Sequence, residues 1–363
     1  VLDRKQDITA GYATTGMTAR RFITTLKLKP EHLLPPPVQV DVMFYDKMVS
    51  FQDQDNRIGF YLIDIPAYLR SLISEAEALG VQIKCGLTFT GYERSTTVLE
   101  PNTVTAIAAD GLKMVFRCRF LVGADGTNSE VARKLSLDRN FDTIKGIEWV
   151  TNDNNIIEDR NYKFIFDRNL APGYFAWVFR SGQQTAIGIS LKEQTVKLKD
   201  KYQEIKVSYL KHFGITLPEN PAQKPGGVIP TGGVLKNISN NVGCLIGDAA
   251  GYCGRFGLDG ICPAFVSGVK AAEALAAFLN NRVSRVHYTV PNNVYALGDN
   301  GQLLRKFIDL AATNSVFNFL GQMFDDDLGQ QMFSYVLIDN GTHVYQQIFK
   351  VYFNPKGIKY FIK

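Results

Sequence analysis

Apolar residues follow two different spacings along this chain, and the change from one to the other divides the sequence. Between Asp64 and Gly80 they return every three or four positions, which predicts a helix with Pro66 in its first turn. Its predicted buried stripe consists of Leu69, Leu72, Ile73, Ala76 and Leu79. A buried strand is expected to end at Asp3, and residues 81–89 predict the next strand. This alternation of strand and helix is typical of an α/β fold.

The middle of the chain has the shorter spacing of β-strands. Runs 104–109 and 113–116 flank Asp110-Gly111, a strong hairpin signal. Alternating runs at 162–166, 175–179 and 185–191 predict antiparallel strands, and 193–213 predicts a helix packed on their sheet. Further on, 242–246 predicts a buried strand and 262–279 a long helix rich in small residues, with mostly helices after Asn281.

The order of these elements predicts a mixed α/β (α+β) fold in three regions. A Rossmann-like nucleotide-binding domain is expected from residues 1–37, 62–140 and 236–290, so it is assembled from discontinuous segments. Residues 38–61 and 141–235 are expected to form an inserted antiparallel β-sheet domain that binds the substrate. Residues 291–363 are expected to form a helical C-terminal region.

Two similar motifs carry the strongest chemical signal. Each is an apolar strand, a small-residue turn with one aspartate and a helix: 121–129 contains Asp125, and 242–251 contains Asp248. Small residues let the backbone approach a planar or phosphorylated ligand closely. The carboxylate can accept hydrogen bonds from ribitol or ribose hydroxyls, and the helix N-terminus offers N–H groups to an anion. The alternative is that both motifs are plain tight turns between a strand and a helix.

These two motifs, in this order, resemble the DG and GD motifs of the p-hydroxybenzoate-hydroxylase-like superfamily of FAD enzymes. Within that superfamily the chain is most similar to the geranylgeranyl reductase family, over residues 1 to about 290. The resemblance implies FAD as the cofactor and implies that Asp248 contacts its ribityl-phosphate part. It extends the predicted FAD site to the other residues of both turns, namely Gly123, Asp125, Gly126, Gly247, Ala249 and Gly251.

The start of the long helix is a further part of the predicted FAD site. Asp259-Gly260-Ile261 stands where the family places a glycine-containing loop against the flavin, so Gly260 and Ile261 are predicted to bind the cofactor. A helix N-terminus there would stabilise negative charge on the reduced flavin. The alternative is a plain helix cap by Asp259. Arg20 or its neighbour Arg21 is predicted to meet a phosphate, and solvated arginines on a helix are the alternative.

The same resemblance implies that Asp3 binds the adenosine ribose hydroxyls. A GxGxxG phosphate loop is expected about twenty residues before such an acid, and we find none in the sequence. We therefore expect that an N-terminal strand, loop and helix are missing and that this chain binds FAD poorly. Restoring the segment is expected to tighten FAD binding by at least about tenfold, because the pyrophosphate would regain its helix N-terminus.

A third motif concerns the substrate. The segment 172–180, followed by Gly188-Ile189-Ser190, resembles the YxWxFP…GxG element of the reductase family, whose aromatic residues line an isoprenoid-sized pocket. Alternation places Phe175, Trp177 and Phe179 on one face of a strand, and we predict that they bind an apolar substrate. The alternative is that they form the core of the sheet domain. The chain departs from the family element at three positions, Phe175, Arg180 and Ser190.

Composition limits the other classes of function. The net charge of +5 is mild and the basic residues are scattered, which does not indicate nucleic-acid binding. The five cysteines lack CxxC spacing and there are four histidines, so we expect no metal site. Scattered thiols favour the cytoplasm. We find no run of about eighteen apolar residues, and we expect no membrane-spanning helix.

The C-terminal tail combines phenylalanines with lysines and could rest on a membrane surface. The alternative is a helical region that packs its own aromatic residues. The residues concerned are Phe317, Phe319, Phe324, Phe349, Phe353, Phe361, Lys350, Lys356, Lys359 and Lys363.

Together these motifs predict an FAD-dependent oxidoreductase that reduces carbon–carbon double bonds of a hydrophobic, isoprenoid-like substrate, with NAD(P)H as a candidate electron donor. A flavin monooxygenase of the same superfamily is the first alternative, since it shares both aspartate motifs. A flavin-free binding module is the second. The sequence identifies no residue that would donate the proton.

Overall fold

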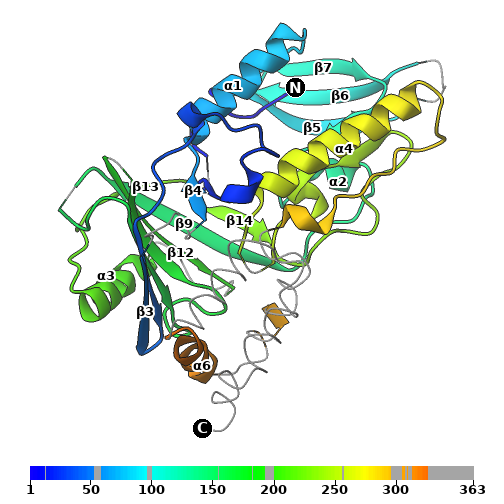
Figure 1. The fold of residues 1–363 in the computed structure, drawn as a ribbon. Helices are drawn as coiled ribbons and strands as arrows, with labels where there is room; N and C mark the ends of the chain where they lie inside the picture. Colours follow the sequence, from blue (N-terminus) through cyan, green and yellow to red (C-terminus); the bar gives the residue numbers. More distant parts are fainter. Residues whose placement is uncertain are drawn as a thin grey trace.

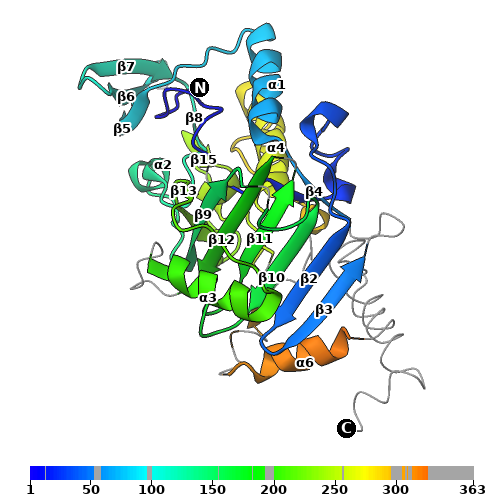
Figure 2. The ribbon, with the colours of Figure 1, turned by 90° about the vertical axis from the view of Figure 1, so that its left-hand side faces the viewer.

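The structure is a computed structural model of the chain. It describes residues 1–325 except 13, 53–58, 96–99, 154, 182, 193–199, 256, 296–304, 307–308 and 310–312. Two parts lie one above the other in Figures 1 and 2: a group of short sheets with the helices α1, α2 and α4, and below it an eight-stranded sheet.

The eight-stranded sheet has the strand order β13-β9-β12-β11-β10-β2-β3, and β14 also pairs with β9. Most neighbours are antiparallel, but β10 and β2 pair in parallel, so the purely antiparallel sheet that we expected is in fact mixed. The reason is that β2 and β3 come from far upstream in the chain. The strands are β2 (Gln39–Phe44), β3 (Lys47–Gln52), β9 (Thr143–Thr151), β10 (Asn161–Phe166), β11 (Ala176–Ser181), β12 (Gln184–Leu191), β13 (Ala222–Gln223) and β14 (Gly227–Pro230).

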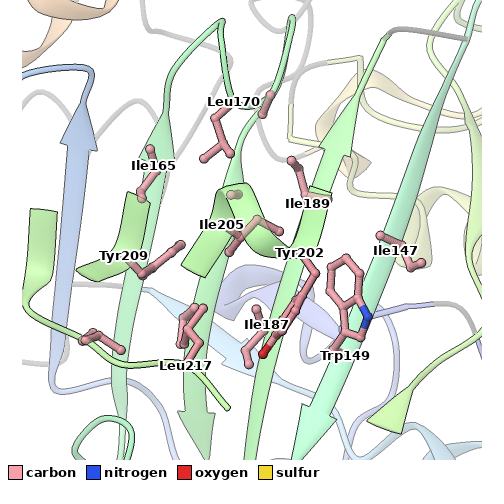
Figure 3. Packing of buried hydrophobic residues seen from close by; sticks show 14 of the residues in the cluster. Ile147, Trp149, Ile165, Leu170, Ile187, Ile189, Tyr202, Ile205, Tyr209 and Leu217 are labelled. Carbon is pink, nitrogen blue, oxygen red and sulfur yellow. The ribbon is translucent and has the colours of Figure 1, made fainter. Parts of the chain in front are cut away.

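One face of this sheet is covered by the helix α3 (Lys201–Phe213), as Figure 2 shows. The predicted helix began at residue 193, and residues 193–199 lie outside the described part of the chain. Figure 3 shows the hydrophobic core between helix and sheet, where Ile187, Ile189 and Ile205 are fully buried. Alternation along each strand sends these side chains to the helix and their neighbours to the opposite face.

The opposite face carries most of the aromatic side chains of the sheet. The helix α6 (Ser315–Met323) packs against β2 and β3 on this side, and its Phe317 is fully buried there. Phe324 is buried in the same cluster, whereas Phe319 is exposed. For Phe317 and Phe324 this supports internal packing over contact with a membrane. The other phenylalanines and lysines of the predicted tail lie outside the described residues.

The upper part contains the predicted parallel strands. The strands β8 (Leu121–Gly123) and β15 (Gly243–Leu245) pair in parallel, and Leu2 forms a separate parallel bridge with Lys84. Around them lie α1 (Ile65–Ala78), α2 (Glu130–Lys134) and α4 (Ile261–Leu279). The remaining strands are β1 (Met17–Ala19), β4 (Phe60–Leu62), β5 (Leu87–Glu93), β6 (Asn102–Ala108) and β7 (Lys113–Cys118). The short 3-10 helices are Arg20–Phe22, Pro30–His32, Gly247–Ala250 and Asn292–Val294.

Most predicted elements of this part are present. The Asp110-Gly111 hairpin is confirmed, because β6 and β7 pair in antiparallel orientation across it. The helix α1 begins after Asp64, whose carboxylate accepts the N–H of Ala67. The predicted buried stripe of α1 is wrong at its C-terminal end, where Leu79 is 85% exposed. Only the first turns of α1 pack into the cluster around Leu26.

The long helix α4 bears on the expectation that the chain has no membrane-spanning helix. It is the single described helix that is long and apolar enough to cross a membrane by length and composition. Such a lone match is weak evidence. Its Cys262 and Ala271 are buried inside the protein, in two different core clusters.

Candidate functional site

The turn that follows β15 brings a carboxylate to the end of a buried strand. Gly247–Ala250 form one turn of 3-10 helix, and Gly251 ends it in the left-handed conformation with φ of 78°. A Cβ atom at Gly251 would lie 2.2 Å from the carbonyl oxygen of Gly233, so only glycine fits there. The N–H of Gly247 donates to Oγ of Ser267 on α4, at 2.9 Å, and holds the turn against that helix.

The carboxylate of Asp248 lies beside the start of α4. One of its oxygens would be 3.4 Å from a Cβ atom at Gly260, the residue that precedes the helix. Within the described part of the chain this carboxylate accepts no hydrogen bond, and burial raises the pKa of Asp248 to about 6. The N-cap residue of α4 is Gly260, which has no side chain to cap the helix. The site therefore combines an unsatisfied acceptor with backbone N–H groups.

The turn after β8 uses its carboxylate differently. The two oxygens of Asp125 accept the hydroxyl of Ser129 at 2.6 Å and the N–H of Val131 at 3.0 Å. The hydroxyl of Ser129 in turn accepts the N–H of Ala132. Asp125 is thus satisfied by the first turn of α2, which is the plain strand-to-helix turn named above as the alternative.

One asparagine connects the two turns. The side-chain amide of Asn140 donates to the carbonyl oxygen of Asp248 at 2.8 Å and to that of Thr127 at 3.3 Å. The N–H of Ile246 also donates to the carbonyl oxygen of Gly123, because β15 and β8 are neighbouring parallel strands. The structure therefore brings the turns of Asp125 and Asp248 to one edge, as we expected from their strands.

All the predicted cofactor residues stay predictions, and two of them, Asp3 and Arg20, lie outside the turns of Asp125 and Asp248. Asp3 follows the bridge between Leu2 and Lys84, and its carboxylate accepts the N–H of Lys5 at 2.8 Å. Arg20 is exposed, with its N–H bonded to the carbonyl oxygen of Gly59. The other predicted members of the site lie in the two turns just described or, for Gly260 and Ile261, at the start of α4.

Cys253, next to the Asp248 turn, is a small buried residue that fills space in the protein interior. Burial raises the pKa of its thiol well above the usual value, so the thiolate form needed for redox chemistry is disfavoured. Burial likewise raises the pKa of Cys262 to about 12. All five cysteines of the chain are free thiols.

The aromatic face of the eight-stranded sheet is the second component. The rings of Phe166 and Phe175 have centroids 5.1 Å apart, and Phe175 also contacts Phe164 and Trp177. Phe179 packs against Tyr162, one pair further along the sheet. Phe175 is half-buried, whereas Trp177 and Phe179 are buried. The three predicted substrate residues share a face, and that face is turned away from α3.

The start of the aromatic strand is held by a residue from the C-terminal part of the chain. Arg305, which is 5% exposed, donates to the carbonyl oxygen of Gly173 at 2.5 Å and lies over the ring of Tyr174. Asp309 pairs with the same guanidinium at 2.6 Å. We did not predict Arg305, and nothing in its local sequence distinguishes it from a surface arginine. Asn140 was missed for the same reason.

The site can be tested for FAD on its own chemistry. The ribityl chain of FAD carries hydroxyl donors and its pyrophosphate is anionic. A half-buried carboxylate that accepts no hydrogen bond from the described residues, beside a helix N-terminus, therefore fits these groups. The fit rests on Asp248 and on the backbone at Gly260 and Ile261.

Comparison with known proteins agrees with this fit. Residues 60–285 match the family described as FAD binding domain. These residues make up more than half of the chain and include both aspartate turns.

Individual proteins of known sequence or structure are similar to the chain. Digeranylgeranylglycerophospholipid reductase 1 of Methanococcoides burtonii is 27% identical over 241 residues, which cover 62% of this chain and 54% of that protein. The chain spans about half the length of the first curated relatives it matches.

Two solved structures show the same fold. A geranylgeranyl bacteriochlorophyll reductase-like protein of Thermoplasma acidophilum superposes with a TM-score of 0.66 at 16% identity, over 99% of this chain and 90% of that one. Aklavinone-11 hydroxylase, in a complex with FAD and aklavinone, superposes with a TM-score of 0.55 at 15% identity, over 77% and 57% of the two chains.

Proposed function

Because this chain belongs to the FAD binding domain family, we propose that it is part of an FAD-dependent oxidoreductase that reduces carbon–carbon double bonds of a hydrophobic, isoprenoid-like substrate. The observation that carries the substrate class is the aromatic face of the sheet. There the half-buried ring of Phe175 contacts three other rings, those of Phe164, Phe166 and Trp177. On this face the rings of Phe164, Phe166 and Phe175 are only partly buried. Aromatic rings suit a long apolar chain better than a small polar substrate.

The proposed role of the Asp248 turn is to hold the cofactor. Asp248 accepts hydrogen bonds from ribityl hydroxyls, and the N-terminus of α4 at Gly260 and Ile261 stabilises negative charge beside it. Asn140 fixes the turn by its bond to the backbone of Asp248. The reduced flavin supplies the hydride for such a reaction, and the protein orients it.

The remaining assignments complete this proposal. NAD(P)H is the proposed electron donor, and the double bond gains a proton in addition to the hydride. Free thiols at all five cysteines support work in a reducing compartment, the cytoplasm. The relatives named for reductase activity on digeranylgeranylglycerophospholipid support a lipid-like substrate.

The test is a single-turnover reduction. The protein is loaded with FAD, reduced chemically without oxygen and mixed with a geranylgeranyl lipid or geranylgeranyl diphosphate. We expect the flavin absorbance to return and the product to gain two hydrogens for each double bond reduced. A flavin that stays reduced with every isoprenoid offered would contradict the proposal.

A monooxygenase is the competing activity, since a hydroxylase shares the fold. The same experiment separates the two. An oxygen atom incorporated into the product when oxygen is admitted, with no reduction in its absence, would identify the monooxygenase. The relatives named as reductases favour the reductase.

A further inference from the structure

Three residues on three neighbouring strands lie in one row across the aromatic face. Trp177 of β11 is paired with Gly188 of β12, and Gly188 is paired with Glu148 of β9. Residues that are paired across a sheet project to the same side. The row therefore places a large ring, an empty position and a carboxylate next to each other.

The indole ring of Trp177 occupies the space above Gly188. A Cβ atom at Gly188 would lie 2.2 Å from two carbon atoms of the ring, so any side chain would displace the indole. The ring reaches across Gly188 to β9, where its Nε1–H donates to Oε2 of Glu148 at 3.2 Å. The tryptophan and the first glycine of the third motif are thus parts of one packing arrangement.

Glu148 is an unusual residue for a sheet interior. It is 7% exposed, and burial raises the pKa of its carboxyl although the ammonium of Lys224 works against that rise. Nζ of Lys224 lies 2.8 Å from Oε1 of Glu148, and the N–H of Lys224 donates to the carbonyl oxygen of Glu148. A buried ion pair contributes little net stability compared with apolar residues of the same size. Its presence therefore calls for a role besides stability.

The ion pair also reaches the upper part of the molecule. Nζ of Lys224 lies 5.0 Å from the ring centroid of Tyr12, in the segment that leads to β1. A continuous chain of contacts thus runs from the N-terminal segment to the aromatic face, through Tyr12, Lys224, Glu148 and Trp177.

We propose that Glu148 is a positioning residue: by accepting the indole N–H of Trp177 it holds that ring over Gly188, and so sets the shape of the surface that receives the apolar substrate. Lys224 keeps the carboxylate of Glu148 in place. Without the acceptor the indole can turn away from Gly188, which opens the surface and leaves its N–H unpaired. The effect of Glu148 on substrate binding rests on the proposed function. Its effect on the position of the Trp177 ring does not.

The chain offers a direct probe of this ring, because it has two tryptophans. Trp149 lies on the opposite face, packed on Tyr202 at a centroid distance of 4.9 Å. In a W149F background, the fluorescence spectrum, anisotropy and acrylamide quenching report Trp177 alone. We compare E148A and E148Q, and as a control E219A, which removes an exposed glutamate bound to Lys206 on α3.

We expect E148A to lower the anisotropy of Trp177 and to raise its quenching, while E148Q, which keeps an acceptor, and E219A stay close to the parent. The KM for the isoprenoid should rise by about five- to tenfold in E148A, with FAD affinity unchanged. G188A should also displace the ring without touching Glu148, and it serves as the second variant should E148A not fold. Unchanged Trp177 fluorescence in E148A would overturn the proposal, and unchanged Trp177 fluorescence in G188A would do so as well, because it would show that the ring does not lie over Gly188. Neither outcome depends on turnover of an isoprenoid.

Discussion

The turns of Asp125 and Asp248 follow adjacent parallel strands and are joined by Asn140, yet their carboxylates are in opposite situations. Asp125 accepts two hydrogen bonds from the first turn of its own helix. Asp248 accepts none from the described residues, and burial raises its pKa to about 6. The first carboxylate completes a helix, whereas the second has no partner among the described residues and is the one that we propose binds the cofactor.

The difference teaches that one sequence pattern can serve two physical purposes. Both motifs contain an apolar strand, small residues and one aspartate, and their spacing does not reveal which carboxylate is satisfied internally. What separates them is the helix that follows. Ser129 starts α2 four residues after Asp125, within reach of its oxygens, whereas α4 begins only at Ile261 and lies beside Asp248 through Gly260.

The largest expected effect is the loss of FAD affinity in D248A. Hydrogen bonds to a charged acceptor contribute about 1.5–3 kcal/mol each, so the Kd should rise by at least about tenfold. D248N, which keeps one acceptor oxygen, should fall between the parent and D248A. Titration followed by flavin fluorescence measures all three, and an unchanged Kd in D248A would remove Asp248 from the site.

The next effect is on the pH dependence of FAD binding. Hydroxyl donors prefer the ionised carboxylate, so affinity should weaken as the pH falls below about 6 and Asp248 takes up its proton. The slope should approach about tenfold per pH unit and be absent in D248N. Without FAD, the raised pKa of Asp248 makes the stability of the folded chain decrease, not increase, as the pH rises. The folded chain binds the proton more tightly than the unfolded one and becomes less stable as the pH rises from 3.8 to about 6.

D125A should mainly affect stability. The loss of the two bonds at the start of α2 should lower the free energy of unfolding by about 1 kcal/mol, measured by urea denaturation. FAD affinity should change by less than about threefold, since the carboxylate already has partners. An effect of D125A on FAD affinity as large as that of D248A would support the prediction that Asp125 also binds the cofactor and would contradict the proposed contrast between the turns.

The smallest effect is expected for S129A. It removes the cap on the N–H of Ala132 and one of the two partners of Asp125. We expect about 0.5–1 kcal/mol of lost stability. The Asp125 carboxylate, freed of one partner, becomes more available to solvent and ligand. If FAD binding weakened in S129A without a loss of stability, the result would show that Ser129 acts on FAD binding through the Asp125 turn and not through the stability of α2.

The fold was largely predictable from the sequence. Hydrophobic spacing located β8, β15, α1 and α4, because periodicity and terminal residues such as Asp64 and Gly80 act locally. The parallel pairing of β2 with β10 was missed, since pairing between segments 122 residues apart leaves no local signal. The exposure of Leu79 was missed because the spacing shows which residues could be buried but not whether a partner covers them.

The candidate site was predictable in part. The motifs pointed to Asp248, Trp177 and Gly188, but not to the residues that hold them. Glu148 did leave a signal, since it is a charged residue in the otherwise apolar run from Ile147 to Val150, at a position facing a buried sheet surface. Asn140 left none, because an asparagine in a loop is ordinary.

The parallel pairing of β2 with β10 has a consequence for how the molecule is made. The hairpin of β2 and β3 leaves the ribosome long before β10, and until then β2 presents an unpaired apolar edge. Closing so long a loop is a slow step in folding. Asp41 of β2 pairs with Lys163 of β10 directly across this seam, and the ion pair is almost fully buried. A shift of the β2–β10 pairing by one residue would separate the two charges inside the protein, which is unfavourable. The ion pair therefore favours the observed register when the nascent chain completes its sheet.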